Sequence, residues 1–205
     1  MTLPSIIAIY APAPQSGKST IAKYLVGSQA YVTLAFADPI KEWLVHFLVM
    51  YGYTNDQARH YLWEDKATPL VKIPDQPTAR HLMQTLGTEW GRNLISPSLW
   101  TELWVIKASK LLNQDKKVVT EDLRFLSEWE ATKDPRVLTH KRTSQAWYVS
   151  RIEALDAALA AGDLNHASEG NFCNRTDVFD AFFENEGTIP DLFEQVENHL
   201  NPKTK

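Results

Sequence analysis

The sequence is poor in cysteine: Cys173 is the single thiol among 205 residues. One thiol can form no internal disulfide and cannot build a cysteine-only zinc site, so both structural supports are excluded. A chain of this length buries about 70% of its unfolded surface and needs neither support. The cysteine usage fits a reducing compartment, and we expect a cytoplasmic protein.

Long apolar runs and strongly basic segments are also missing. The N-terminal MTLPSIIAIYAPAP has no basic region and its apolar run is too short to cross a bilayer, so we expect neither a signal peptide nor a membrane partner. The net charge is −4 without a long basic run, which argues against strong nucleic-acid binding, although a local basic cleft can still hold a nucleotide. No histidine pair has H-x-x-x-H or H-E-x-x-H spacing, so no zinc site is expected.

Short apolar runs alternate with longer amphipathic segments, which is typical of a three-layer α/β fold with a mostly parallel sheet. Strands are predicted at residues 5–10, 31–35, 116–120, 136–139 and 178–182. Helices are predicted at residues 18–26, 38–50, 55–65, 78–90, 97–112, 145–161 and 189–200. The segment 145–161 is interpreted as a helix because it is rich in alanine.

The strongest local feature is SGKST at residues 16–20, between the first predicted strand and the first predicted helix. Amide groups at a helix N-terminus attract phosphate oxygens, and glycine lets the backbone approach them closely. In such a loop Lys18 reaches the β- and γ-phosphates, the Ser19 hydroxyl holds Mg²⁺, and Thr20 contacts the α-phosphate. The order of strand, loop and helix favours a phosphate loop over a chance helix start. The predicted loop comprises Gln15, Ser16, Gly17, Lys18, Ser19 and Thr20.

One position departs from the pattern G-x-x-x-x-G-K-[ST], because Pro12 stands where the leading glycine is expected. Proline fixes φ at about −65° and has no N–H group, so the loop cannot start with the usual glycine turn. The alternating alanines and prolines of APAP are expected to stiffen the start of the loop.

Charged residues follow the predicted strand at 116–120. Asp122 could bind a metal through water or position an acceptor, and Arg124 could neutralise a phosphate. The alternative is that Asp122 caps the next helix while Arg124 pairs with Glu128. The residues alone favour neither interpretation.

Other polar residues lie in or just after the segment RHLMQTLGTEWGR. Arg80 and Gln84 are four residues apart, hence on one helix face, where they could hold a phosphate and a base. A solvated basic face is the commoner alternative. Gly87 and Gly91 are expected to break or loosen the helix, which would put Arg92 on a turn.

Two further pairs have the same ambiguity. Asp38 and Lys41 follow the second predicted strand and are either ligand-binding residues or an N-cap and a surface charge. Arg142 and Arg151 flank a polar, aromatic stretch that could form a lid over ATP, or they are ordinary surface arginines.

Five separated segments resemble the deoxynucleoside monophosphate kinases of tailed phages. They are APAPQSGKST, LAFADPIKEWL, RHLMQTLGTEWGR, VVTEDLRFLSEWE and HASEGNFCNRTDVFDAFFENEGTIPDLFEQV. They occur in the family's order and span nearly the whole chain, and RHLMQTLGTEWGR and DLRF-x-x-E are the most specific. Residues 51–77 match no part of the family, so the acceptor base is left open.

The resemblance implies an adenylate-kinase-like P-loop NTPase fold that uses ATP and Mg²⁺ to phosphorylate a deoxynucleoside monophosphate for phage DNA synthesis in the host cytoplasm. It implies one kinase domain over residues 1–205, with an acceptor-binding helical region at about 38–112 and a lid at about 142–166. The implied catalytic residues are Lys18, Arg80, Asp122 and Arg124, and the metal site is assigned to Ser19 and Asp122. The implied acceptor pocket is lined by Asp38, Lys41, Arg80, Gln84, Arg92 and Asp122. Beyond the loop, the nucleotide site is assigned to Arg142, Asn185 and Gly187.

Two other functions stay open at this point. One is a P-loop kinase for another small molecule, such as a modified nucleotide or dephospho-coenzyme A. The other is a nucleotide-gated binding protein without turnover, a class that no residue pattern here positively supports. A homodimer is possible in either case.

Overall fold

In the computed structural model, residues 3–139, 141–161, 172 and 175–202 are described, and the chain forms two compact units. The first unit comprises residues 1–35 and 105–205, and the second comprises residues 36–104. The second unit covers most of the helical region expected at about 38–112. Its role in acceptor binding stays a prediction.

The first unit is built on a five-stranded, parallel sheet with the strand order β2-β3-β1-β4-β5. The strands are β1 (Ile6–Tyr10), β2 (Tyr31–Thr33), β3 (Lys117–Thr120), β4 (Ser144–Ser150) and β5 (Ala181–Glu184). Ile6 of the central strand pairs with Val118 of β3 and with Ser144 of β4. All five residues of β1 are buried, as expected for an apolar run that is covered on both faces of a parallel sheet.

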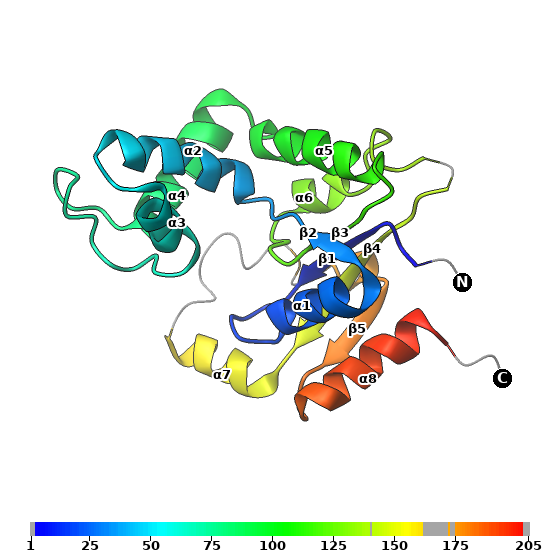
Figure 1. The fold of residues 1–205 in the computed structure, drawn as a ribbon. Coiled ribbons are helices and arrows are strands. Elements are labelled where there is room, and N and C mark those ends of the chain that lie inside the picture. The colour runs from blue at the N-terminus through cyan, green and yellow to red at the C-terminus, as the bar shows by residue number, and fades with distance from the viewer. Residues whose placement is uncertain (1–2, 140, 162–171, 173–174, 203–205) are drawn as a thin grey trace. The chain divides into compact units, whose positions relative to one another are not determined.

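Helices cover both faces of this sheet, which confirms the three-layer α/β fold (Figure 1). On one face, α1 (Lys18–Gln29) and α8 (Ile189–Leu200) enclose a core that includes Ile9, Leu25 and Val196. On the other face, α6 (Leu126–Ala131) covers the sheet, and the ring of Tyr10 packs on Phe179 with their centroids 5.5 Å apart. The remaining elements of this unit are α7 (Ile152–Ala161) and the short η3 (Thr176–Val178). Helix α5 (Leu99–Leu112) begins in the second unit and ends in the first.

The second unit is helical. It contains α2 (Asp38–Met50), α3 (Asn55–Trp63), α4 (Ala79–Gln84) and a π-helix, η1 (Thr85–Ile95). These helices pack around a core that includes Leu48, Leu62 and Trp100. No helix in the described part of the chain is long and apolar enough to cross a membrane.

The structure contradicts the helix predicted at residues 145–161. Residues 144–150 are the strand β4, and only Ile152–Ala161 is helical. The alanine content hid the alternation of Trp147 and Val149, which both point into the same core on one face of the sheet. The expected lid at about 142–166 therefore contains a central strand, and its residues 162–166 lie outside the described residues.

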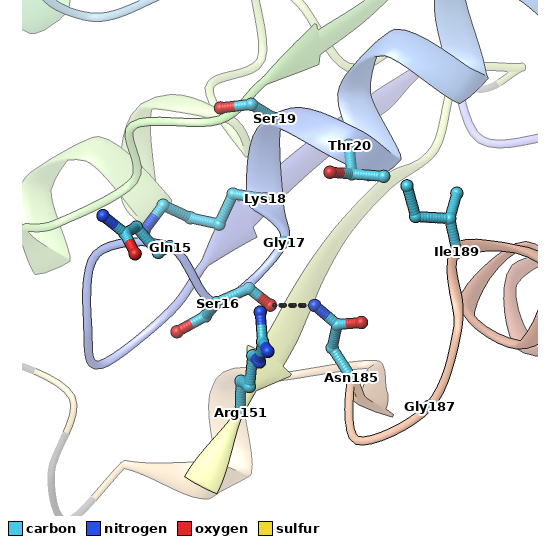
Figure 2. Close-up of a pocket in the computed structure, with 10 residues that line it drawn as sticks. All are labelled: Gln15, Ser16, Gly17, Lys18, Ser19, Thr20, Arg151, Asn185, Gly187 and Ile189. Carbon is cyan, nitrogen blue, oxygen red and sulfur yellow. Dashed lines mark hydrogen bonds between the residues drawn. The ribbon is translucent and has the colours of Figure 1, made fainter. Parts of the chain in front are cut away.

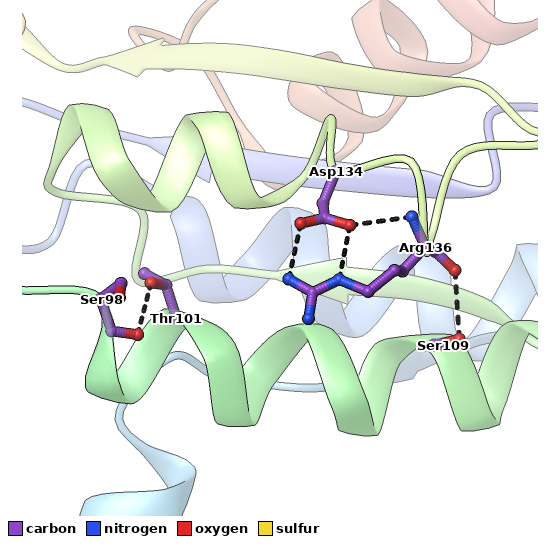
Figure 3. A network of polar contacts seen from close by, with 5 residues as sticks. All are labelled: Ser98, Thr101, Ser109, Asp134 and Arg136. Carbon is purple, nitrogen blue, oxygen red and sulfur yellow. Dashed lines mark hydrogen bonds and ion pairs between the residues drawn. The ribbon is translucent and has the colours of Figure 1, made fainter.

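The strand predicted at residues 136–139 is also wrong, because a local ion pair closes a turn there. Asp134 accepts hydrogen bonds from the backbone N and Nε of Arg136, both at 2.8 Å, and from its Nη2 at 2.7 Å (Figure 3). Ser109 Oγ then donates to the carbonyl oxygen of Arg136 at 3.1 Å, tying the turn to α5. The hydrogen bonds from Arg136 lower the pKa of Asp134.

Several element boundaries also differ from the prediction, and in two of those that follow a glycine was given too much weight. Helix α1 continues through Gly27 to Gln29 and ends at Ala30, whose φ is 56°. The helix predicted at 78–90 is not broken by its glycines but continues from α4 into η1. The last strand begins at Ala181 rather than at residue 178, because Thr176–Val178 forms a short 3₁₀ turn.

Candidate functional site

The SGKST sequence spans the end of the loop after β1 and the first residues of α1, at the carboxyl end of the sheet (Figure 2). Gln15 and Gly17 have left-handed φ values of 61° and 108°, which bend the backbone sharply on either side of Ser16. Ser16 is buried, and its Oγ donates to the carbonyl oxygen of Ala13 at 2.8 Å. In the described part of the chain no side chain caps the start of α1, and the amide groups of a helix's first turn are groups that bind anions.

A cavity of about 420 Å³ lies against this turn. Its lining combines the loop, the end of β4 and the turn between β5 and α8, all within the first unit. The lining residues are Gln15, Ser16, Gly17, Lys18, Ser19, Thr20, Arg151, Asn185, Gly187 and Ile189. All six loop residues expected at a nucleotide site, together with Asn185 and Gly187, therefore meet at one cavity, while their contacts with a nucleotide stay predictions.

Asn185 joins the end of β5 to the loop. Its side-chain Nδ2 donates to the carbonyl oxygen of Ser16 at 3.1 Å, and its backbone N donates to Ser150 at 2.8 Å. A Cβ added at Gly17 would lie 2.7 Å from the same Nδ2 atom. Gly17 is thus required both for its positive φ and for the close approach of Asn185.

The two arginines considered for a lid lie at opposite ends of β4. Arg151 follows the strand's carboxyl end and points toward the loop at Ser16 (Figure 2). Arg142 precedes the strand, and its Nη2 donates to the carbonyl oxygen of Leu112 at 2.8 Å and to Asn113 Oδ1 at 3.0 Å. Nine residues of extended chain separate them by roughly 30 Å. Arg151 therefore lines the cavity and Arg142 does not, while a contact of either side chain with a nucleotide stays a prediction.

Carboxylates gather after β3, at the edge of the sheet where β1 leads into the loop. Asp122 Oδ1 accepts a hydrogen bond from Thr120 Oγ1 at 2.8 Å. Oε2 of Glu121 is buried and has no hydrogen-bond partner among the described residues. Sequence reasoning missed Glu121, although it stands directly before Asp122. Neither Asp122 nor Arg124 lines the cavity.

The cap of α6 is provided by a third carboxylate. Glu128 Oε2 accepts from the backbone N atoms of Arg124 at 2.7 Å and of Phe125 at 3.1 Å. The alternative in which Asp122 caps this helix is therefore not what the structure contains. Glu128 does contact Arg124, as the alternative expected, but the contact includes the backbone amide of Arg124. A charge pattern on a helix surface predicts only side-chain pairs and not this bond.

The oxygen donors fit Mg²⁺, which prefers carboxylate and hydroxyl ligands and retains several waters. Ser19 lines the cavity, and Asp122 follows the neighbouring strand. Glu121, whose Oε2 has no hydrogen-bond partner among the described residues, stands directly before Asp122 in the chain. Among the described residues no group of three or more His, Cys, Asp or Glu side chains could hold a metal ion. A site with so few protein ligands is typical of a Mg²⁺ ion that is also held by a nucleotide's phosphates.

The remaining predicted residues lie in the second unit. Asp38 is the first residue of α2 rather than its N-cap, and its Oδ1 lies 3.4 Å from Nζ of the largely buried Lys41. Arg80 and Gln84 are exposed on α4, while Arg92 lies within η1 rather than on a turn. Their assignment to an acceptor pocket stays a prediction.

Comparisons with known proteins support the fold. No protein-family model and no curated protein matches the sequence. The chain is similar over its full length to the complete chain of the solved structure of TT1252 from Thermus thermophilus, with 16% identity and a TM-score of 0.51. Two further structures align more loosely. One is a Chloroflexus aurantiacus protein at 14% identity and TM-score 0.47, with both chains fully covered. The other is the dephospho-CoA kinase of Campylobacter jejuni, at 13% identity and TM-score 0.40, covering 98% of this chain and all of the other.

Proposed function

We propose that this protein is a kinase that transfers the γ-phosphoryl group of ATP to a deoxynucleoside monophosphate with the help of Mg²⁺. The observation that carries the proposal is the uncapped N-terminus of α1, which meets a cavity lined by Lys18, Ser19 and Thr20. The deoxynucleotide as acceptor rests on the resemblance of five sequence segments to phage kinases. The alternative P-loop kinases share the same loop chemistry and differ in the acceptor.

Phosphoryl transfer requires little covalent help from the protein, so these residues act by binding and alignment. Loop amides and the Lys18 ammonium bind the β- and γ-phosphates, and the dipole of α1 adds favourable potential. Arg151 adds positive charge on the side of the cavity formed by β4. Arg80, Gln84 and Arg92 orient the acceptor in this proposal. Oxygens of Ser19 and Asp122 would hold Mg²⁺, with Glu121 next to Asp122 in the chain. When bound, the ion would neutralise phosphate charge.

The deciding experiment is a coupled ADP-release assay with ATP, Mg²⁺ and each of dAMP, dGMP, dCMP, dTMP and dUMP. Lys18→Ala should reduce turnover at least about a hundredfold, because it removes charge stabilisation that strengthens during transfer. The matched control is Lys23→Ala, which removes an exposed lysine from the same helix and should leave turnover unchanged.

Three other outcomes of this assay would change the proposal, each in a different way. Turnover with dephospho-coenzyme A or a modified nucleotide, but with no deoxynucleoside monophosphate, would replace the acceptor and keep the P-loop chemistry. Full activity of Lys18→Ala would overturn the mechanism. ATP binding without turnover of any acceptor would indicate a nucleotide-gated binding protein.

A further inference from the structure

Burial along α4 and η1 repeats every four residues from residue 79 to residue 92. Ala79, Gly87 and Gly91 are buried, with the partly buried Met83 between them. The next residue in each step is polar: Arg80, Gln84 and Thr88 are exposed, and Arg92 is partly exposed. We call the set Arg80, Gln84, Thr88 and Arg92 the polar strip.

The π-helix is what aligns the strip. An α-helix has about 3.6 residues per turn, so in one continuous α-helix Arg92 would be rotated by about 120° from Arg80. A π-helix has wider turns of about 4.4 residues, because its hydrogen bonds join residues five apart. With one α-helical step followed by two π-helical steps, the rotation between Arg80 and Arg92 falls to roughly 25°. The change of helix type at Thr85 therefore keeps all four side chains on one face.

Trp100, on α5, holds the opposite face of the π-helix. Its buried Nε1 donates to the carbonyl oxygen of Gly87 at 2.8 Å. A Cβ added at Gly91 would lie 2.2 Å from the same nitrogen, so the indole occupies the space that glycine leaves open. One indole thus contacts both buried glycines, which are one π-helical step apart.

We propose that Trp100 is a positioning residue which keeps residues 85–95 in the π-helical form, and that the polar strip thereby binds the phosphate and base of the acceptor. The inference rests on the proposed function and extends it, since it assigns Thr88 to the acceptor site and gives Gly87 and Gly91 a structural role as the residues that Trp100 contacts. Arg80 and Arg92 supply charge for the phosphate, while Gln84 and Thr88 supply hydrogen bonds. All contacts that carry it lie within the second unit.

The kinetic test is Trp100→Phe, which removes the indole N–H and part of the ring. The KM for the acceptor should rise about tenfold while the KM for ATP changes less than about twofold, because mispositioned binding groups lose acceptor binding selectively. The control is Trp104→Phe, which truncates another fully buried indole of the same helix, stacked on Phe36 at 4.6 Å. It should lower stability comparably and leave the acceptor KM unchanged. Equal effects of both variants on the acceptor KM would overturn the positioning role.

A second measurement does not depend on turnover. In ¹⁵N NMR spectra the indole N–H of Trp100 should exchange with solvent far more slowly than that of Trp43, whose side chain is exposed. Titration with a deoxynucleoside monophosphate should shift the Thr88 and Arg92 signals in the wild type and shift them less in Trp100→Phe. Rapid exchange of the Trp100 indole, or shifts confined to other residues, would overturn the inference. Clear shifts without any turnover would instead contradict the proposed kinase reaction and leave the strip as a binding site.

Discussion

The side-chain amide of Asn185 donates a hydrogen bond to the carbonyl oxygen of Ser16 across 169 positions of sequence, at 3.1 Å. Asn185 stands directly after β5, and its own backbone N is bonded to Ser150 at the end of β4. The loop that contains SGKST is therefore held by a residue that joins the ends of the neighbouring strands β4 and β5.

Asn185→Ala should raise the KM for ATP about tenfold and lower the free energy of unfolding by about 1 kcal/mol, because the loop loses a hydrogen bond that restrains it. Asn201→Ala is the matched control, since it removes an exposed amide that donates to Glu197 at 3.0 Å. Steady-state kinetics and urea denaturation measure the two effects. An unchanged KM in Asn185→Ala would show that the loop keeps its geometry without the bond.

The variants Arg151→Ala and Arg142→Ala should change different quantities, the first the KM for ATP and the second the free energy of unfolding. Arg151→Ala should raise the KM for ATP about tenfold, because it removes positive charge from the cavity, and its exposed ion pair with Glu153 contributes little to stability. Arg142→Ala should leave the KM unchanged and lower the free energy of unfolding by about 1 kcal/mol, since it removes the bonds to Leu112 and Asn113. The opposite pattern would restore Arg142 to the nucleotide site.

Stability should fall as the solution is acidified below about pH 6.5, because burial lowers the pKa of His199 and Asp180 offsets this only in part. His199 Nε2 lies 3.1 Å from Gln145 Oε1, which also accepts from Trp147 Nε1 at 2.8 Å, so Nε2 carries the hydrogen. The unfolded chain takes up a proton at about pH 6.5, whereas the folded chain resists it, so acid favours unfolding between the two pKa values.

Urea denaturation at pH 7.5 and pH 5.5 tests this, with His199→Gln compared with the wild type. His199→Gln should lose less stability on acidification than the wild type. The same loss of stability in both proteins would rule out His199 as the titrating group.

The sequence alone determined the parts of the molecule whose physics is local. SGKST after an apolar run predicted the loop between β1 and α1. The helix predicted at residues 189–200 is α8, and the Thr188 hydroxyl caps its start by accepting a hydrogen bond from Asp191 N. The cap of α8 is formed by residues within one turn of the chain. The α/β class followed from the alternation of such segments.

Only the tertiary structure decided the features that depend on distant partners. Alanine content favoured one helix over residues 145–161, but pairing with β1 and β5 on either side makes residues 144–150 an interior strand. Arg151 consequently lies at the cavity, and Arg142 lies at the opposite end of the strand. Gly87 and Gly91 suggest helix breakers in the sequence, but in the structure Trp100 fills the space beside Gly91 and donates a hydrogen bond to the carbonyl oxygen of Gly87, while Ile40 lies against Gly87 itself. Local propensity is worth a few tenths of a kcal/mol per residue, and burial against neighbours outweighs it wherever the two disagree.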